Sequence, residues 1–180
     1  MRKICITFLI VGIIILSGIG IVKNEKTVHE EYLRIHIRAN SNLDIDQAVK
    51  YKVKDAVVNF LTPFIANCTS KEKAVNMLSA QLNGVEKVAD KVLSDNGFNY
   101  KSRAKIKNEK FPTRVYSSFK LESGFYDALI IELGNGTGDN WWCVVYPPLC
   151  FTESGASFQY KSKIYEIILD FQKKFNKGEI

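Results

Sequence analysis

The chain has 180 residues, of which 46% are apolar and 24% charged, and its formal net charge at pH 7 is +6. This length and composition predict one globular domain that buries enough apolar surface to fold without a structural metal. Two basic residues precede a long apolar run at the N-terminus, so the remainder carries about +4 (6 minus 2). That excess is typical of a solvated surface. Because no basic cluster alternates with aromatic residues, nucleic-acid binding is not expected.

The first 22 residues carry an export signal. A run without charged residues extends from Ile4 to Val22, directly after the basic start. Its full length can span a bilayer as a helix, whereas its first part, followed by Gly18 and Gly20, fits a signal peptide that is removed. Both readings remain open, and in both the basic flank predicts export of the rest of the chain. Residues 23–30 are expected to form a polar tether.

Residues 31–39 predict the first strand of the domain. Leu33, Ile35 and Ile37 alternate with polar residues, which is the period-2 pattern of a strand with one apolar and one polar-basic face. His36 lies between two arginines on the polar face. We therefore interpret His36 as a surface or partly buried structural histidine.

A helical pattern follows. Apolar residues recur at helical spacing from Ile45 to Phe64, and Asp44 with Gln47 three residues later resembles a capping box. This helix is expected to bend or end before Pro63, because proline lacks the backbone N–H and clashes with the preceding turn.

A second helical pattern starts with Thr69 and Glu72. We expect Asn83-Gly84 to break it, so that the apolar residues beyond form a third helix. Asn96-Gly97 then predicts a helix C-cap.

Strand patterns return near residue 100. Residues 113–121 and 125–133 predict two strands joined as a hairpin by three residues. Residues 141–146 predict the last strand, ending at Pro147, and residues 160–175 predict an amphipathic helix. Before these, four basic residues alternate with apolar ones and predict a strand with a basic face: Lys101, Arg103, Lys105 and Lys107.

This order of elements predicts an α+β domain. It has one strand, two or three helices, a mostly antiparallel sheet of about four more strands, and a C-terminal amphipathic helix. The domain is expected to cover residues 31–151, and the C-terminal helix residues 152–180.

No arrangement of residues predicts catalysis. The chain has neither a G-x-S-x-G nor an H-E-x-x-H motif. Residues 134–138 (GNGTG) lead toward a strand rather than into a helix, so a flexible connection is a better interpretation than a phosphate loop. A nucleophilic pair of Cys143 and His36 would need a spatial closeness that the sequence does not indicate. We expect no enzyme activity, no cofactor and no small-molecule substrate.

Three cysteines lie beyond the N-terminal segment: Cys68, Cys143 and Cys150. The last two flank a turn constrained by Pro147 and Pro148, and an exported protein meets an oxidising compartment. A disulfide between Cys143 and Cys150, leaving Cys68 without a mate, is the first interpretation, and two buried thiols also fit. A metal site fits poorly, because C-x-x-C is absent and neither histidine has ligand spacing to a cysteine.

Residues 140–151 (NWWCVVYPPLCF) hold the strongest candidate for a binding surface. Both tryptophans of the chain are adjacent there, and neighbouring residues on a strand point to opposite faces. One indole can enter a core while the other meets a second surface, although all of these aromatics could simply fill the core. Tryptophan and tyrosine concentrate binding energy at protein interfaces. The predicted partner-binding residues are Trp141, Trp142, Tyr146, Pro147, Pro148 and Phe151.

Three blocks of sequence, in this order, carry a resemblance to a known family. They are residues 33–42 (LRIHIRANSN) with the nearby 46–47 and 52–57, residues 111–129 with FPT and GFYDAL, and residues 140–151. Together they resemble the stage II sporulation protein R family of endospore-forming bacteria, over residues 31 to 151.

The resemblance implies a function. Members of this family are made in the forespore and exported into the space between the forespore and mother-cell membranes. There they activate a membrane-embedded aspartic protease of the mother cell, which processes the precursor of sigma factor E. For this chain the resemblance implies the same partner and location, with a membrane contact through the N-terminal segment if it is uncleaved. The alternative is an exported cell-wall binding module or hydrolase that uses Trp141 and Trp142.

Overall fold

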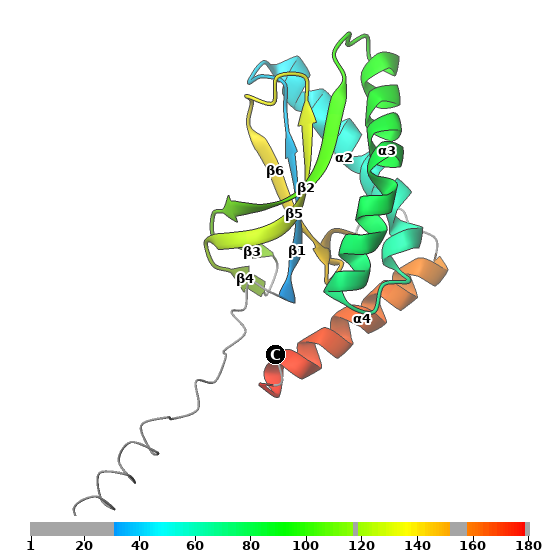
Figure 1. Ribbon diagram of the computed structural model, residues 1–180, viewed down its shortest axis with the longest axis vertical. Helices are drawn as coiled ribbons and strands as arrows, with labels where there is room; N and C mark the ends of the chain where they lie inside the picture. The colour runs from blue at the N-terminus through cyan, green and yellow to red at the C-terminus, as the bar shows by residue number, and fades with distance from the viewer. Residues whose placement is uncertain (1–30, 117–118, 152–157, 179–180) are drawn as a thin grey trace, which may run out of the picture.

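The computed structural model describes residues 31–116, 119–151 and 158–178. The expected export segment (1–22) and tether (23–30) lie outside the described residues. The fold is α+β, as predicted: two long helices cover one face of a mixed four-stranded sheet, and a short hairpin lies toward the other face (Figure 1). In chain order the elements are β1 Leu33–Arg38, α2 Asp44–Ile65, α3 Lys71–Asp95, β2 Ser102–Phe111, β3 Arg114–Tyr116, β4 Phe119–Leu121, β5 Gly124–Leu133, β6 Asn140–Tyr146, the 3-10 turn η2 Leu149–Phe151 and α4 Phe158–Asn176.

The four strands lie in the order β2-β5-β1-β6. The central strand β1 pairs in parallel with β5 and antiparallel with β6, and β2 pairs antiparallel with β5. Two of these three pairings are antiparallel, which confirms the mostly antiparallel sheet.

The hairpin predicted from residues 113–121 and 125–133 is wrong in its pairing. The partner of β5 is β2, in a ladder that runs from Ser102 opposite Leu133 to Phe111 opposite Gly124. The segment between them forms its own small hairpin, β3–β4. Adjacency in sequence favoured the nearer segment, but β2 offers ten paired residues whereas β3 and β4 pair only three each.

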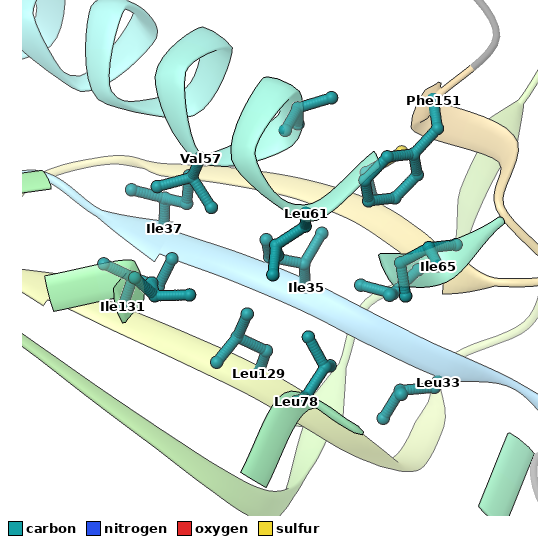
Figure 2. Packing of buried hydrophobic residues seen from close by; sticks show 14 of the residues in the cluster. Leu33, Ile35, Ile37, Val57, Leu61, Ile65, Leu78, Leu129, Ile131 and Phe151 are labelled. Atoms are coloured by element: carbon teal, nitrogen blue, oxygen red, sulfur yellow. The ribbon is translucent and has the colours of Figure 1, made fainter. Parts of the chain in front are cut away.

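The main core lies between the sheet and the helices (Figure 2). Leu33, Ile35 and Ile37 of β1 are fully buried there and meet Leu61 and other residues of α2 and α3. Burying one such side chain stabilises the fold by about 1.5–3 kcal/mol. Figure 2 also shows Phe151 of η2, which is fully buried and packs at one end of this core.

Helix α2 differs from its prediction at both ends. Its N-cap is Leu43, without a side-chain cap, and Gln47 donates from its amide to the carbonyl of Ser41 rather than completing a capping box. The helix continues through Pro63 to Ile65. Proline costs only one hydrogen bond so close to the end, and burial of Leu61 and Ile65 on the same face holds the last turn.

Helix α3 is a single helix, so the predicted break at Asn83-Gly84 is wrong. The buried face continues from Leu78 to Val85 and beyond, and packing outweighs the cost of glycine, about 1 kcal/mol. A Cβ on Gly84 would lie 2.6 Å from the Phe60 ring, so glycine permits close packing of α2 on α3. The N-cap is Ser70, whose side chain accepts from Lys73 N, and not the predicted Thr69. At the other end, Gly97 has a φ of 81° just beyond the C-cap Asn96, in agreement with the predicted stop at Asn96-Gly97.

The polar-basic face of β1 is not exposed. Arg34 is 0% and His36 1% exposed, because a second apolar cluster covers that side of the sheet. Tyr32 connects this cluster to α4 through an edge contact with Phe171, with ring centroids 5.4 Å apart. His36 is therefore fully buried, and not at the surface or partly buried as predicted, and β1 is buried on both faces. The members of the second cluster are Tyr32, Phe111, Leu121, Tyr126, Ala128, Ile130, Val144 and Phe171.

Candidate functional site

The two tryptophans lie on opposite faces of β6, an edge strand, as alternation predicts. Trp141 packs on the helix-side core and Trp142 on the second cluster, and both remain partly exposed. Each has a cation near its ring: Lys54 Nζ of α2 is 5.9 Å from the Trp141 ring centre, and Arg114 Cζ of β3 is 5.9 Å from that of Trp142. Neither indole is fully buried in the core, so both can contribute to a contact surface.

Trp142 covers a buried histidine. Its ring stacks on His36, with centroids 3.8 Å apart, and meets the Phe111 ring edge-on at 4.8 Å. The pairing of His36 with Trp142 in the β1–β6 register places the two rings on the same face. Burial lowers the pKa of His36 to about 4, so its imidazole is neutral at physiological pH.

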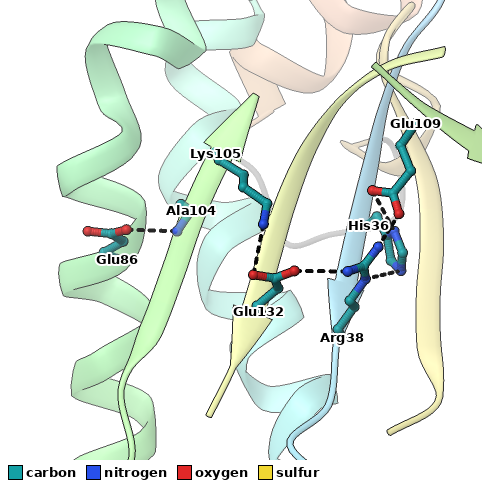
Figure 3. A network of polar contacts seen from close by, with 7 residues as sticks. All are labelled: His36, Arg38, Glu86, Ala104, Lys105, Glu109 and Glu132. Carbon is teal, nitrogen blue, oxygen red and sulfur yellow. Dashed lines mark hydrogen bonds and ion pairs between the residues drawn. The ribbon is translucent and has the colours of Figure 1, made fainter. Parts of the chain in front are cut away.

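A charged network lies beside this histidine (Figure 3). Arg38 donates to Glu109 and to Glu132, the latter at 2.8 Å, and its Nε lies 3.4 Å from His36 Nε2. Lys105 joins the same network from β2, 2.9 Å from Glu132. These lysine and arginine contacts hold the pKa of the Glu132 carboxyl below its usual range, despite partial burial. The network ties β1, β2 and β5 together on the side opposite the helices.

Within the described residues, the buried Arg34 contacts aromatic rings and a tyrosine hydroxyl but no carboxylate. Its guanidinium lies 4.2 Å from the Phe111 ring centre and 4.9 Å from that of Tyr126, and it donates to Tyr116 Oη at 2.6 Å. Its Nε and Nη1 have no hydrogen-bond partner among the residues that the structure describes. Cation–π contacts replace an ion pair here. Since Tyr116 belongs to β3, this contact fastens the β3–β4 hairpin over the second cluster.

The Pro-Pro turn is closed by a disulfide, as predicted. Cys143 and Cys150 are bonded, with Cα atoms 6.2 Å apart, and Cys68 is a buried free thiol. The Cys150 sulfur also lies 3.1 Å from the amide N of Val144, so η2 folds back against the outer edge of β6.

The other predicted contact residues are largely internal. Tyr146 is 9% and Phe151 0% exposed, and both prolines of the turn are buried. These residues support the turn from within. A direct role for them in partner binding stays a prediction, and the accessible part of the proposed surface is Trp141 and Trp142.

The Gly-rich loop before β6 is firmly held, so its interpretation as a flexible connection is wrong. Asn40 accepts from Asn135 N, Asn42 accepts from Asp139 N, and Gly138 N donates to the carbonyl of Ala39. A Cβ on Gly138 would lie 2.2 Å from the Ser41 carbonyl oxygen, so only glycine fits this approach.

Asp46 organises the other side of the same loop region. Its carboxylate accepts from Ser41 Oγ at 2.5 Å, Tyr100 Oη at 2.6 Å and Asn40 Nδ2 at 2.9 Å. Burial alone would raise the pKa of Asp46, but these hydrogen bonds outweigh it and hold the pKa below its usual value. Asn40, Ser41 and Asp46 belong to the first resemblance block, and the structure gives them a role in positioning the loop that leads into β6.

A pocket of about 420 Å³ lies between the start of α3 and α4. Its acidic residues are Glu31, Glu72, Glu166 and Asp170. They are interspersed with lysines that already form ion pairs: Lys71 pairs with Asp127 outside the pocket, and Lys174 pairs with Asp170 within it. Within the described residues no group of three or more metal-binding side chains comes together. In the same part of the chain, no helix is long and apolar enough to cross a membrane.

Comparison with known proteins agrees with the sequence resemblance. The family model described as stage II sporulation protein R matches residues 29–156. A curated relative, stage II sporulation protein R of Bacillus subtilis (strain 168), is 33% identical over 151 residues, which are 78% of this chain and 67% of that protein. No solved structure matches.

Proposed function

This chain belongs to the stage II sporulation protein R family, and from that premise we propose that it is an exported sporulation signal. It acts on a membrane-embedded aspartic protease of the mother cell, and that protease then processes the precursor of sigma factor E. The chain is made in the forespore and works between the two membranes, either secreted or anchored by its N-terminal segment. It functions by binding and not as an enzyme.

One structural observation supports a binding role above others. Trp141 and Trp142 are partly exposed on opposite faces of an edge strand, each beside a cation. The strand is rigid, because the disulfide closes the turn at one end and the hydrogen-bonded loop holds the other. A surface that is already ordered loses less conformational entropy on association.

The alternative is a cell-wall module that stacks sugars on the tryptophans. The stacking of His36 on Trp142, with centroids 3.8 Å apart, leaves the opposite face of that indole and Trp141 to carry such contacts. Retention of the full chain on a peptidoglycan column, lost in Trp141→Ala, would favour this alternative.

The proposal is tested by expressing the full chain, the candidate protease and the sigma-factor precursor together in a non-sporulating host. We expect processing only when all three are present and the N-terminal segment is intact. Trp142→Ala and Trp141→Ala should reduce processing, whereas Phe125→Ala, which removes an exposed aromatic residue elsewhere, should not. Immunoblots of precursor and product give the readout, with non-reduced peptide mapping of Cys143–Cys150 as the check on folding.

Two outcomes separate the function from the surface. If omitting this chain leaves processing unchanged, the signalling function is wrong. If the chain is required but both tryptophan variants fold and the protease still processes the precursor at the normal level, the function stands and the contact lies elsewhere.

A further inference from the structure

We propose that the outer edge of β6 at Asn140 and Trp142 accepts an extended, acidic segment of a partner protein as an added β-strand. The inference rests on the proposed function in naming the protease as that partner. It deepens the function by stating how the partner binds and with what chemistry.

Alternation along β6 shows which backbone groups face outward. The nitrogen and oxygen of Val144 lie 3.1 Å and 2.9 Å from the Cys150 sulfur, which packs on the side away from β1. Because strand residues alternate, Trp142 and Asn140 direct their N–H and C=O groups to the same outer side. Ala39 N bonding to Asp139 O agrees with this, since odd-numbered residues then face β1.

The outward backbone groups at the two edges of the sheet differ in whether they have hydrogen-bond partners. At β2, Glu86 accepts from Ala104 N at 2.7 Å (Figure 3). Asp90 accepts from Ser102 N, also at 2.7 Å, so side chains from α3 occupy outward amides of this edge. At β6, η2 covers Val144, but no described element bonds the outward backbone groups of Asn140 or Trp142. Exposed edges are normally covered or charged to prevent pairing. An open edge beside the two tryptophans therefore points to a strand-addition site.

The charge around this edge identifies the occupant as acidic. Arg114 is exposed beside Trp142 and makes no ion pair in the described part of the chain, and buried Arg34 adds a second uncompensated cation on that face. On the other face, the ion pair of Lys54 within the described ranges is with its exposed neighbour Asp55, a contact of small net value. A carboxylate on the added strand, on the Trp142 face, would meet the Arg114 guanidinium.

The same charges disfavour a second copy of this chain. Antiparallel pairing of two β6 edges keeps corresponding faces together, so the Arg114 side chains of both copies would share one face. Like charges placed opposite each other destabilise strand pairing. A different, acidic protein segment fits better.

The first test compares Asn140→Pro with Asn140→Ala in the full chain, co-expressed with the candidate protease and captured from detergent-solubilised membranes. Both variants lose the same side chain, but only proline removes the outward N–H, which is not part of the β1 ladder. We expect the proline variant to capture about fivefold less protease than the alanine variant. Equal capture by two folded variants would overturn the strand-addition site.

The second test stays informative even if the proline variant fails to fold. Arg114→Glu should weaken capture several-fold and reduce its salt dependence, whereas Lys107→Glu, an exposed reversal on β2, should leave both unchanged. Equal effects of the two reversals would overturn the acidic-segment assignment.

A photo-reactive residue at position 140 of the full chain then identifies the occupant. Cross-links to an acidic, extended segment of the protease support both the edge and the proposed function. Cross-links to such a segment of another exported protein overturn the protease as partner. They still support the strand-addition edge if they are lost in Trp142→Pro and kept in Trp142→Ala. Cross-links to residues 23–30 or to a second copy overturn the inference, while the processing assay still reports on the function by itself.

Discussion

The imidazole of His36 lies flat beneath the indole of Trp142, with ring centroids 3.8 Å apart and planes inclined by 23°. This contact joins the central strand to the edge strand and keeps the histidine 1% exposed. A residue of the proposed contact surface therefore also shields a titratable group in the interior, so we expect changes at Trp142 to alter stability as well as the proposed binding.

His36 makes the stability of the fold depend on pH. Its folded pKa of about 4 lies below the ordinary 6.5, so below pH 6.5 the unfolded chain takes up a proton that the folded chain does not. Stability is complete above pH 6.5 and falls as the pH decreases toward 4, by about 2 kcal/mol at pH 5. Urea unfolding of the full chain at pH 7.5 and pH 5 measures this.

The matched variant is His36→Gln, which cannot titrate. Carboxylates with lowered pKa, such as Asp46 and Glu132, also lose stability in acid, but they do so in both proteins. The difference between wild type and variant isolates the histidine. An identical pH dependence in the two proteins would contradict the prediction.

The Cys143–Cys150 disulfide should stabilise the fold. Replacing both cysteines by alanine removes a crosslink over a sequence separation of 7, for which loop closure predicts a loss of about 2–3 kcal/mol. Thermal unfolding under non-reducing conditions gives the measurement. Cys68→Ala is the control, because this free thiol is not part of the bond. The Cys68→Ala variant should keep the disulfide, so the reducing agent should still lower the melting temperature of that variant. Insensitivity of the wild type to reductant would contradict the prediction.

Arg34 and Tyr116 should be energetically coupled. Tyr116→Phe removes the hydroxyl that accepts from the buried guanidinium, and leaving such a donor unsatisfied costs about 1–3 kcal/mol. In an Arg34→Met background, the same tyrosine change should cost nearly nothing, since no cation is left to satisfy. A double-mutant cycle by urea unfolding measures the coupling, and additive effects would show that the hydrogen bond contributes little.

Gly138 should be less replaceable than Gly84. Alanine at Gly138 places a Cβ 2.2 Å from backbone Ser41 O, which cannot move aside without shifting the loop, so we expect a loss of about 1–3 kcal/mol. Alanine at Gly84 meets the ends of two side chains, those of Phe60 and Gln81, and gains helix propensity of about 1 kcal/mol, so the net change should be small. Equal losses in chemical denaturation would show that the loop is not held as described.

The features predicted correctly from sequence depend on neighbours along the chain. The period of two that puts Trp141 and Trp142 on opposite faces is a property of any strand. The helix end at Asn96-Gly97 needs only local dihedral angles, and the spacing of Cys143 and Cys150 about two prolines is enough to suggest their bond. The same local reasoning was wrong at Gly84, because the bulk of Phe60 that makes glycine useful there belongs to another helix.

The sequence by itself therefore determined the class of fold, the family, the disulfide and the tryptophan pair as candidate surface. Tertiary structure decided that β1 is central, that β2 rather than residues 113–121 pairs with β5, and that β6 forms an edge. It also decided that Arg34 and His36 are buried, since only the cover supplied by Phe111, Tyr126 and Trp142 removes them from water. The physical reason is that periodicity reports which way a side chain points, whereas burial depends on what distant parts of the chain place over it.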